Sequence, residues 1–400
     1  MNENTTVLIS GAGIAGLTLA YWLRRHGFEP TVVERAPAIR AGGYKVDIRG
    51  AALTVAERMG LMDEIRARVT GVRSGTVVNA AGRQVASMDG DTFGGRVHGD
   101  AELLRGDLHQ LLYKNTDAEY LFGDSIVGLT QTDTGVEVAF ESGLVRTFDL
   151  VVGSDGLHSA TRALAFGPEE EFLRDLGHRI AIFGVPNHLG LDREEVTFIG
   201  PGRTALAYST GDGADAKAMF LFRSGESDGT AVPRGREAQE RALAAAYEGE
   251  GWEVPRLLDA MSAAPDFYFD AVAQVHMDRW SSGRVALLGD AAYCASPASG
   301  QGTSLAMVGA YVLAGELAAA GGDHRAGFAA YEREMQPFVE RNQKLGPANL
   351  KRMVMRTAGA VRMSMAMLGL MNRMPGRERL MAKVIAPIHA AATAIALKEY

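Results

Sequence analysis

The sequence contains a single cysteine, Cys294, in 400 residues. One thiol can form neither a disulfide within the chain nor a metal cluster of several cysteines, so both are excluded. Such sparing use of cysteine is typical of proteins that work in a reducing cytosol. We therefore expect a cytoplasmic protein without a metal site.

Basic residues and long apolar runs are also scarce. The chain has 41 Lys and Arg against 48 Asp and Glu, and this net charge of −7 disfavours non-specific binding to nucleic acid. The apolar stretch from Met363 to Met371 covers about ten residues, whereas a membrane span requires about twenty. The polar N-terminus does not resemble a signal peptide. We expect no nucleic-acid partner, no membrane span, and a monomer or a homodimer.

Hydrophobic residues make up 47% of the chain and charged residues 22%, which is typical of a globular protein with ample material for a core. The length suits two or three domains, or one large discontinuous domain. The 48 glycines are more informative. Three stretches join a short apolar strand to glycine and an acidic residue, and most of the interpretable chemistry lies in them.

The first of these stretches has the order of a dinucleotide-binding unit. A predicted strand at 7–9 leads into the glycine run 11–16, a predicted helix at 17–26, and a second strand at 31–33 that ends at Glu34. A glycine run alone is a weak signal. Here it stands between a strand and a helix, and the acidic residue follows 18 positions after the last glycine. We therefore predict a dinucleotide site.

Each residue type in this unit has a physical role. Gly11 permits the tight turn, Gly13 lets a pyrophosphate approach the backbone, and Gly16 lets helix and strand pack closely. Glu34 is placed to accept a hydrogen bond from a ribose hydroxyl, which argues against the 2′-phosphate of NADP at this ribose. The unit does not distinguish NAD from FAD. Arg35 is interpreted either as stacking on adenine or as a solvated surface residue.

Two later stretches repeat the combination of strand, glycine and acid. The predicted strand 146–152 ends in Gly153-Ser-Asp155-Gly156. The predicted strand 285–288 is followed by Gly289-Asp290, a turn-rich segment and a helix at 303–320. A carboxylate in such a place can hold a polyol, and the N–H groups and dipole of a helix N-terminus attract an electron-rich group.

The middle of the chain is predicted to form a structural layer separate from the dinucleotide-binding unit. Residues 178–225 hold strand-length segments separated by glycine turns, which indicates an antiparallel sheet inserted into an α/β protein. The predicted strands span 179–185, 195–199, 204–209 and 218–223, with helices at 236–247 and 254–263 and a further strand at 267–275. Such a sheet can form one wall of a pocket opposite a cofactor domain.

Two other segments have open interpretations. A helix is predicted to begin near Arg105, a position from which an arginine commonly reaches a phosphate; the alternative is an ion pair with Asp107 or Glu102. An amphipathic helix is predicted at 328–345, and the tail from Asn349 is helical and rich in methionine. A methionine stripe is far more often core packing or an oligomer contact than a cofactor site.

The three motifs together carry a family resemblance. They are Gly11-x-Gly13-x-x-Gly16 with Glu34, Asp155-Gly156 in D-L-V-V-G-S-D-G-L-H-S-A-T-R, and Gly289-Asp290 in R-V-A-L-L-G-D-A-A. This set resembles the FAD-dependent group A monooxygenases, the aromatic hydroxylase family, over residues 5–345. The set is specific because NAD dehydrogenases lack the second and third motifs. The glycine loop before Asp47 and the run E-L-L-R-G-D-L are most similar to the tetracycline-inactivating monooxygenases.

The resemblance implies an α/β fold. Its parts would be a Rossmann-like FAD-binding domain of the aromatic hydroxylase type, an inserted antiparallel-sheet substrate domain and a C-terminal helical segment. The expected division is a discontinuous FAD-binding domain at 1–175 and 270–335, a substrate-binding sheet domain at 176–269 with part of 72–100, and C-terminal helices at 336–400.

The resemblance also implies the residues of the cofactor site. Those expected to bind cofactor are Gly11, Ala12, Gly13, Ile14, Ala15, Gly16, Glu34, Arg35, Arg40, Asp47, Arg105, Asp155, Gly156, Gly289, Asp290, Gly300, Gln301, Gly302 and Thr303. Within this set, the glycine unit with Glu34 would hold the ADP half of FAD. Arg105 would contact the FAD backbone, Asp290 the ribityl chain or a phosphate, and Asp47 the flavin. The amides of 300–303 would lie at the flavin pyrimidine edge.

Further roles follow from the same resemblance. Arg40 matches a position implicated in NADPH binding, and Asp155 with Gly156 matches a motif tied to both FAD and NAD(P)H. Pro297 and Gly300 would shape the environment of flavin and oxygen, with no protein nucleophile. Arg203 is interpreted as a substrate contact or as an ordinary hairpin arginine.

The chain departs from the family pattern near its third motif. Tyr293 replaces the usual histidine and is followed by Cys294, Ser304 replaces the usual asparagine, and the run 308–310 replaces an expected aspartate. The polar substrate contacts of the tetracycline enzymes are also poorly matched. These departures leave the substrate open.

The implied reaction is reduction of FAD by NAD(P)H, with NADPH favoured, capture of O₂ as a flavin C4a-hydroperoxide, and oxygen transfer to a polycyclic aromatic or tetracycline-like small molecule. The alternatives are a non-oxygenating flavoprotein, such as a prenyl reductase on the same scaffold, and a non-enzymatic FAD carrier. The segment Trp252-Glu-Val-Pro255 is only a fragment of the halogenase motif W-x-W-x-I-P, which disfavours halogenation. Asp155, His158 and Ser159 are neighbours in sequence, which is not the geometry of a catalytic triad.

Overall fold

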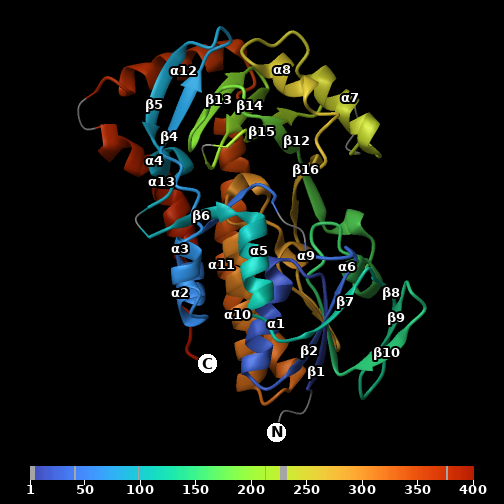
Figure 1. Cartoon of the computed structure of the whole chain (residues 1–400). Coiled ribbons are helices and arrows are strands. Elements are labelled where there is room, and N and C mark those ends of the chain that lie inside the picture. Colours follow the sequence, from blue (N-terminus) through green and yellow to red (C-terminus); the bar gives the residue numbers. More distant parts are fainter. Residues whose placement is uncertain (1–4, 40–41, 98, 212, 226–231, 375–376) are drawn as a thin grey trace.

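The computed structural model describes residues 5–39, 42–97, 99–211, 213–225, 232–374 and 377–400. The molecule has two halves, each built on a large sheet, one at the bottom and one at the top of Figure 1. A long helix, α11 (His324–Met353), runs beside both. This arrangement determines which loops meet between the sheets.

The lower sheet has six strands in the order β17-β18-β11-β1-β2-β7. Their bounds are Ser281–Ser282, Val285–Leu287, Leu150–Gly153, Thr6–Ser10, Glu29–Glu34 and Glu119–Phe122. All pairs are parallel except β17 with β18. The central strands are almost continuously apolar because helices or further strands cover both faces. Parallel pairing brings the carboxyl ends of β1, β2, β11 and β18 to one edge, where the glycine and acidic motifs follow.

Helices α1 (Ile14–Arg25), α5 (Arg105–Lys114) and α10 (Gly302–Ala319) pack with this sheet into the largest hydrophobic core. Helix α10 is buried on nearly all sides, so its sequence is apolar all round rather than along one stripe. Among the described helices, α10 alone is long and apolar enough to cross a membrane. Because 78% of that stretch is buried inside the protein, its apolarity is that of a core helix.

The upper sheet has seven strands in the order β16-β12-β15-β14-β13-β4-β5. Their bounds are Tyr268–Val275, Leu173–Pro186, Asp215–Arg223, Arg203–Tyr208, Glu194–Gly200, Ser74–Val78 and Gln84–Asp89. Pairing is antiparallel except between β13 and β4. Helices α7 (Arg236–Ala246) and α8 (Val254–Asp259) bury a second core against it. The sheet thus combines the predicted insertion with strands from the region 72–100.

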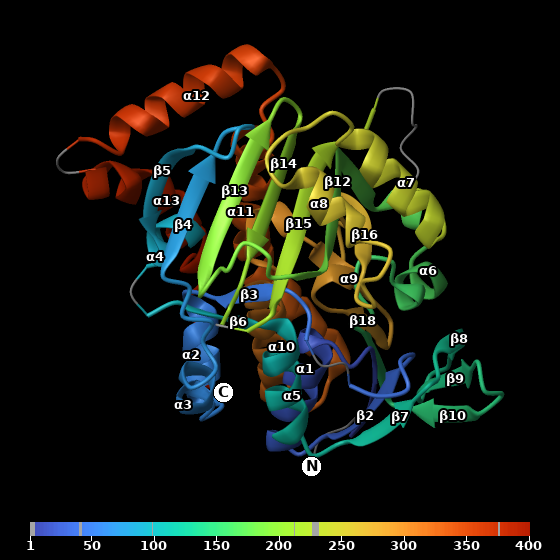
Figure 2. The ribbon, with the colours of Figure 1, turned by 45° about the horizontal axis from the view of Figure 1, so that its top comes forward.

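Smaller elements complete the fold. The remaining strands are β3 (Lys45–Ile48) paired with β6 (Ala101–Leu104), and β8 (Ile126–Gln131), β9 (Val136–Phe140) and β10 (Val145–Phe148) in a three-stranded sheet. The remaining short helices are α2 (Ala51–Arg58), α3 (Met62–Arg66), α4 (Gly90–Gly94), α6 (Ala160–Ala165), η1 (Glu169–Glu171), α9 (Asp290–Tyr293) and η2 (Pro297–Ser299). The β3–β6 pair lies between the two large sheets (Figures 1 and 2).

The C-terminal region joins the two halves. Helix α11 is longer than the predicted 328–345 because it continues through Pro337 and Pro347. Its far end docks on the upper sheet, where Thr204 Oγ1 donates to the Met353 carbonyl. The last residues return to the lower half, where Tyr400 Oη donates to Glu316 of α10 at 2.8 Å. The C-terminal segment therefore fixes the upper sheet to the lower one.

Helices α12 (Ala358–Met371) and α13 (Arg377–Ala392) lie along the outer edge of the upper sheet beside β5 (Figure 2). No residue of α12 is buried. The interpretation of the methionine stripe as core packing is therefore wrong for α12, because the helix contacts the sheet with one side only. An oligomer contact there stays a prediction.

Candidate functional site

The glycine turn between β1 and α1 is built by close backbone approaches. Gly11 has φ +100°, and a Cβ at that position would lie 2.8 Å from the Ser154 carbonyl oxygen. A Cβ at Gly16 would lie 2.0 Å from the carbonyl oxygen of Gly11. A Cβ at Gly13 would meet no atom within 4 Å. Two of the three glycines therefore serve the packing of the turn, and the third faces open space.

Glu34 lies beside this turn at the end of β2. Its Oε2 accepts a hydrogen bond from the Ala12 N–H at 2.9 Å, and its Oε1 accepts one from the Ala36 N–H at 2.8 Å. The half-buried carboxylate is thus held against the glycine run, and each oxygen retains a lone pair for a further donor. Arg35 is exposed and forms no hydrogen bond or ion pair with any described residue.

Asp155 follows β11, and its carboxylate is used locally. Oδ1 accepts from Ser159 Oγ at 2.5 Å, and Oδ2 accepts from the Thr161 N–H at 2.9 Å. These bonds fix the start of α6. Gly156, with φ +85°, faces open space. The structure thus directs the Asp155 side chain to its own loop and leaves the neighbouring backbone accessible.

His158 forms no triad with Asp155 and Ser159. Its Nδ1 lies 3.0 Å from Glu169, and its Nε2 lies 3.2 Å from Asp270 on β16. The imidazole therefore bridges the loop after β11 and a strand of the upper sheet, which is an electrostatic contact between the two halves rather than a nucleophile-activating one.

This bridge makes stability depend on pH. Hydrogen bonds to Asp270 and then to Glu169 raise the pKa of His158 to about 9. Because the pKa of His158 in the folded protein exceeds its ordinary value of 6.5, the bridge contributes its full stabilisation below about pH 6.5. This stabilisation is lost as the pH rises through 9. We expect the free energy of urea unfolding of the wild type to fall relative to that of His158→Gln over this interval. The change stays below about 1 kcal/mol, since half of the side chain is exposed. A constant difference across the interval would contradict the assignment.

Asp290 follows β18 and Gly289 at the start of α9. Its side chain is exposed, and yet so much protein surrounds it that burial raises its pKa, an effect opposed by the Cys294 thiol and the Arg105 guanidinium. The side chain of Arg105, at the start of α5, forms no hydrogen bond or ion pair with a described residue, and the Asp290 carboxylate is hydrogen-bonded with the Cys294 thiol.

The loop from Pro297 to Thr303 leads into α10. Pro297, Gly300 and Gly302 are exposed, Thr303 is half-buried, and a Cβ on either glycine would meet no atom within 4 Å. Gln301 is fully buried, and neither its side-chain oxygen nor its side-chain nitrogen has a hydrogen-bond partner. An unsatisfied buried amide costs free energy, so such a group calls for an additional partner.

The described residues fit FAD on these observations. Gly13 and Gly302 leave space beside a helix N-terminus, as a pyrophosphate or an electron-rich ring requires. Arg105 supplies a cation whose side chain has no ion pair with a described residue, and Asp290 supplies an acceptor that has lone pairs beyond its bond with the Cys294 thiol; these suit the phosphates and the polyol of a flavin dinucleotide. Among the described residues, no group of three or more His, Cys, Asp or Glu side chains could hold a metal ion.

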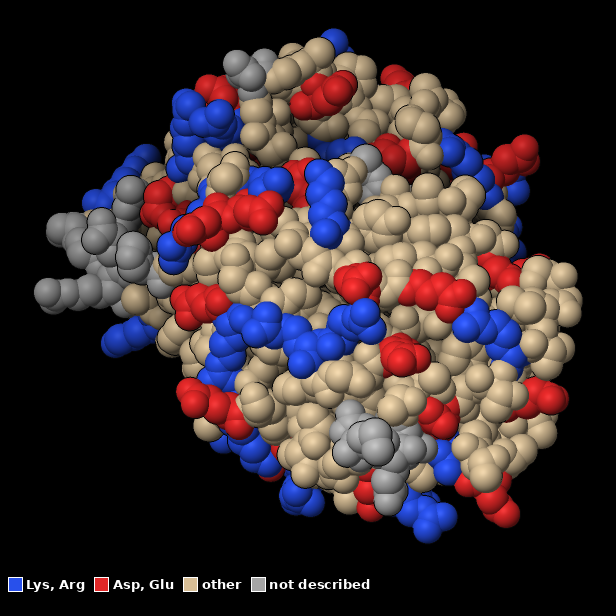
Figure 3. All heavy atoms as spheres, turned by 60° about the horizontal axis from the view of Figure 1, so that its bottom comes forward, with Lys and Arg blue, Asp and Glu red and all other residues tan. Residues whose placement is uncertain are grey.

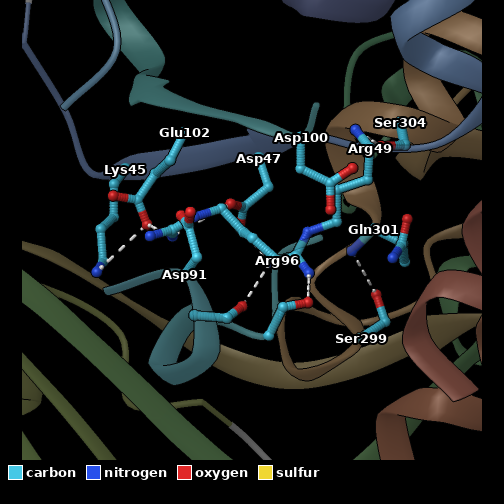
Figure 4. A network of polar contacts seen from close by, with 12 residues as sticks. Lys45, Asp47, Arg49, Asp91, Arg96, Asp100, Glu102, Ser299, Gln301 and Ser304 are labelled. Atoms are coloured by element: carbon cyan, nitrogen blue, oxygen red, sulfur yellow. Dashed lines mark hydrogen bonds and ion pairs between the residues drawn. The ribbon is translucent and has the colours of Figure 1, made fainter. Parts of the chain in front are cut away.

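Asp47 lies in a buried charge network (Figure 4). Its Oδ2 accepts from Arg49 Nη2 at 2.8 Å, and its Oδ1 lies 3.7 Å from Arg96 Nη1 without a hydrogen bond. Burial raises the pKa of Asp47 despite the nearby Arg49. The Arg49 backbone N–H donates to Ser304 Oγ of α10 at 3.1 Å. The network thus connects the end of the β3 strand to the first turn of α10.

The sequence predicted neither this network nor a pair of aromatic residues near Asp290. The rings of Tyr44 and Tyr268 lie 6.3 Å apart, and both pKa values are raised, first by burial and also by Asp290. Tyr44 belongs to the glycine loop before Asp47, so an aromatic residue in that loop was the signal that the sequence offered for this pair. Tyr268 comes from β16, and only the tertiary fold brings it to Tyr44.

Two predicted residues stand apart from this arrangement. Arg40 lies outside the described residues. Arg203 begins β14, where its guanidinium lies 3.4 Å from Glu250, contacts the Ala246 carbonyl and stacks on the Tyr247 ring at 5.8 Å. Its described contacts are those of a hairpin arginine, and a substrate contact stays a prediction.

Comparison with known proteins places the chain among flavoproteins. A family model described as an FAD binding domain matches residues 4–177 and 219–345. An uncharacterized protein of Mycobacterium tuberculosis (strain ATCC 25618 / H37Rv) is 48% identical over 349 residues, which cover 86% of this chain and 93% of that protein. A flavin-dependent monooxygenase of an unknown prokaryotic organism is 41% identical over 347 residues, covering 86% and 89%.

Solved structures agree with this placement. Tetracycline destructase Tet(55) has a TM-score of 0.85 and 38% identity, and the match covers 100% of both chains. HpxO of Klebsiella pneumoniae, solved with FAD and uric acid, has a TM-score of 0.72 at 20% identity over 96% of each chain, which shows the fold alone. The aromatic-hydroxylase fold and the similarity to tetracycline-inactivating enzymes, both expected from the sequence, are confirmed. The chain belongs to the FAD-binding family of flavin-dependent monooxygenases.

Proposed function

We propose that this protein is an NAD(P)H-dependent monooxygenase that uses O₂ to hydroxylate a polycyclic aromatic or tetracycline-like small molecule. The observation that carries the proposal is the electrostatic link between Asp290 and Arg105, since the Arg105 guanidinium works to lower the pKa of that carboxyl while its side chain forms no hydrogen bond or ion pair with a described residue. The similarity to a tetracycline destructase over the whole chain supports the substrate class. NADPH is the favoured reductant, and the cytosol the proposed location.

We assign the cofactor-binding roles as follows. Gly13 and the start of α1 would receive the pyrophosphate, and Glu34 a ribose hydroxyl. Arg105 would pair with a phosphate and Asp290 would accept from the ribityl hydroxyls. The buried Gln301 amide and the N–H groups at the start of α10 would satisfy the polar edge of the flavin ring.

When bound, FAD would take up reducing equivalents and activate O₂ for insertion into the substrate. The chain's own residues orient and shield the reaction. Backbone N–H groups at the start of α10 and the helix dipole favour negative charge on a ring beside them. Pro297, which is exposed, would limit the space next to that ring. No protein nucleophile is required.

The upper sheet would form the substrate wall. We keep the proposed division into a FAD-binding part at 1–175 and 270–335, a substrate part at 176–269 with 72–100, and C-terminal helices from 336, with β12 and β16 crossing the borders between the first two. Tyr44 and Tyr268 offer aromatic surface beside Asp290, suited to a flat ring system. A monomer or homodimer is the proposed state.

The test is NADPH oxidation under air, with and without a panel of polycyclic phenols that includes a tetracycline, followed by product masses. A product heavier by one oxygen atom supports the proposal. Rapid flavin reduction by NADPH without an oxygenated product from any tightly bound ligand would favour the second candidate, a non-oxygenating reductase on the same scaffold. Purified protein that takes up no FAD would contradict both candidates.

Asp290→Ala is expected to weaken FAD binding about tenfold or more, because the ribityl hydroxyls would lose a charged acceptor. The apoprotein should not lose stability, since the cost of enclosing the carboxylate is offset only in part by the Cys294 thiol and the Arg105 guanidinium, and burial still raises its pKa. The measurements are flavin absorbance per protein, a fluorescence titration with FAD, and thermal unfolding of the apoprotein. Cys294→Ala, which removes the neighbouring thiol, serves as the control and should retain FAD. Full FAD occupancy in Asp290→Ala would refute the assignment.

A further inference from the structure

Helix α12 carries its apolar stripe on the outside of the molecule. Met363, Met367, Leu370 and Met374 follow one another at the spacing of a helix face, and their exposed fractions are 71%, 59%, 64% and 48%. Exposed apolar stripes of this kind normally mark a contact with another protein or with a membrane. Methionine adapts to irregular apolar surroundings, which suits a partner without fixed shape.

The other side of α12 accounts for its attachment to the protein. Leu368 and Met371 face Ala86 and Met88 of β5 across a small cavity of about 50 Å³. Figure 2 shows α12 standing clear of the rest of the chain along its outer side. The outward stripe is therefore not needed for packing within the described chain.

The charge around α12 is opposite to that of the protein as a whole. Residues 351–383 contain eight Lys and Arg and a single acidic residue, whereas the whole chain has a net charge of −7. Arg356, Arg362, Arg373 and Lys383 are exposed, and none of them forms an ion pair with a described residue. On the face drawn in Figure 3, by contrast, acidic and basic side chains are interspersed. The basic excess thus accompanies the apolar stripe.

We propose that α12 docks on an anionic phospholipid surface. Helix geometry places Arg362 on one flank of the stripe, about a quarter-turn away from its centre, and Arg373 and Met374 follow in the turn after the end of the helix. The stripe would enter the boundary between headgroups and acyl chains, while the arginines reach the phosphates. A helix of 14 residues is about 21 Å long, which is too short to span the core of a bilayer, so α12 lies in the surface.

Charge favours this occupant over a second copy of the chain. An antiparallel contact of two α12 helices centred on Met367 would bring Arg362 of each copy next to Arg373 of the other. Like charges at that distance repel, and no acidic residue of α12 is available to separate them. An anionic bilayer instead attracts each of these cations.

The test is flotation of the full-length, FAD-loaded protein with vesicles. One preparation contains phosphatidylcholine alone, and the other contains about a third phosphatidylglycerol, which gives the negative surface potential that attracts basic segments. We expect binding to the second preparation only, and release by raised salt, because the attraction is screened. Absence of binding to the phosphatidylglycerol vesicles would overturn the proposal.

Variants locate the contact. Arg362→Glu with Arg373→Glu, and separately Met367→Glu with Leu370→Glu, should each reduce vesicle binding about tenfold or more. The matched controls are Arg66→Glu on α3, an exposed arginine without an ion pair, and Val145→Glu on β10, an exposed apolar residue elsewhere. All six substituted positions are exposed, and flavin absorbance and thermal unfolding check that each variant folds.

Two outcomes would refute the assignment to α12. One is vesicle binding that falls equally in the control variants. The other is a wild-type protein that does not bind vesicles and forms a dimer in sedimentation measurements, where Met367→Glu with Leu370→Glu dissociates that dimer. In that case α12 would be an interface between copies of the chain.

Discussion

Gly16→Ala is expected to lower the free energy of unfolding by about 3 kcal/mol or more, because it overpacks a backbone contact. Gly13→Ala is expected to leave stability nearly unchanged and to weaken FAD binding about a hundredfold, which corresponds to about 3 kcal/mol of binding free energy. The two substitutions add the same methyl group three residues apart. Their different effects would separate the packing role of the glycine turn from its ligand role.

The geometry of each site accounts for the difference. The added Cβ at Gly16 would lie 2.0 Å from the Gly11 carbonyl oxygen and 2.7 Å from Ser154 Oγ, and the first of these atoms belongs to the backbone and cannot swing away. Gly13 has φ −73°, which alanine adopts without strain, and its Cβ would point into open space. That space is where we propose that the pyrophosphate approaches the backbone.

Urea unfolding of the apoproteins measures the first effect, and a fluorescence titration with FAD measures the second. An apo Gly13→Ala protein that is as unstable as Gly16→Ala would show that Gly13 also serves packing. Wild-type FAD affinity in a folded Gly13→Ala protein would remove the proposed phosphate position from this turn. Far-ultraviolet circular dichroism checks that the two variants retain the same helices.

The parts of the site that the sequence predicted are those built by neighbouring residues. The turn from Gly11 to Gly16 and the start of α10 depend on a strand, a glycine and a helix that follow one another in the chain. Short-range order of this kind leaves a pattern in the sequence. The meeting of these loops at one edge also follows from a rule, since parallel strands end on the same side of a sheet.

The parts that the sequence did not predict depend on side chains from distant segments. Arg96 and Glu102 are charged residues that composition alone assigns to a surface, and yet they are 5% and 6% exposed because β3, β6 and α4 enclose them. Asp155 is the opposite case. Its position at a strand end suggested a ligand contact, whereas its side-chain oxygens accept hydrogen bonds from Ser159 and Thr161, and a cofactor contact there stays a prediction. Spacing along the chain cannot reveal which partner an acid takes when several lie within reach.

Glu102 is the centre of the buried charge network. Its Oε2 accepts from Arg96 Nη1 at 2.5 Å and lies 3.4 Å from Lys45 Nζ, and its Oε1 accepts from Thr70 Oγ1 at 2.5 Å. Lys45 in turn pairs with Glu195 on β13 of the upper sheet. One carboxylate therefore holds together the β3–β6 pair and, through Lys45, the contact with the upper sheet.

Glu102→Ala is expected to lower the free energy of unfolding by about 3 kcal/mol, because buried Arg96 would lose its buried carboxylate partner and keep only the carboxylates of the exposed Asp91 at 3.0 Å and of Asp47 at 3.7 Å. Asp117→Ala, which breaks the exposed pair with Arg24, is the control and should cost less than about 0.5 kcal/mol. The stability cost of Thr70→Val should lie between those of the other two variants, at about 1 kcal/mol for the loss of one hydrogen bond. Urea unfolding at neutral pH measures all three, and a Glu102→Ala cost as small as that of Asp117→Ala would contradict the buried network.

The pH dependence of Glu102→Ala provides an independent check. Burial alone would raise the pKa of Glu102, but attraction by Lys45 and then by Arg96 outweighs it and lowers the pKa below the ordinary value of 4.5. A depressed folded pKa means that the contribution is present above pH 4.5 and is lost as the pH falls through the folded value. The stability difference between wild type and Glu102→Ala should therefore narrow in acid. Because β6 pairs with β3, loss of the Glu102 contribution in acid should loosen the strand beside the proposed flavin site, and added FAD should oppose that loss in the wild type.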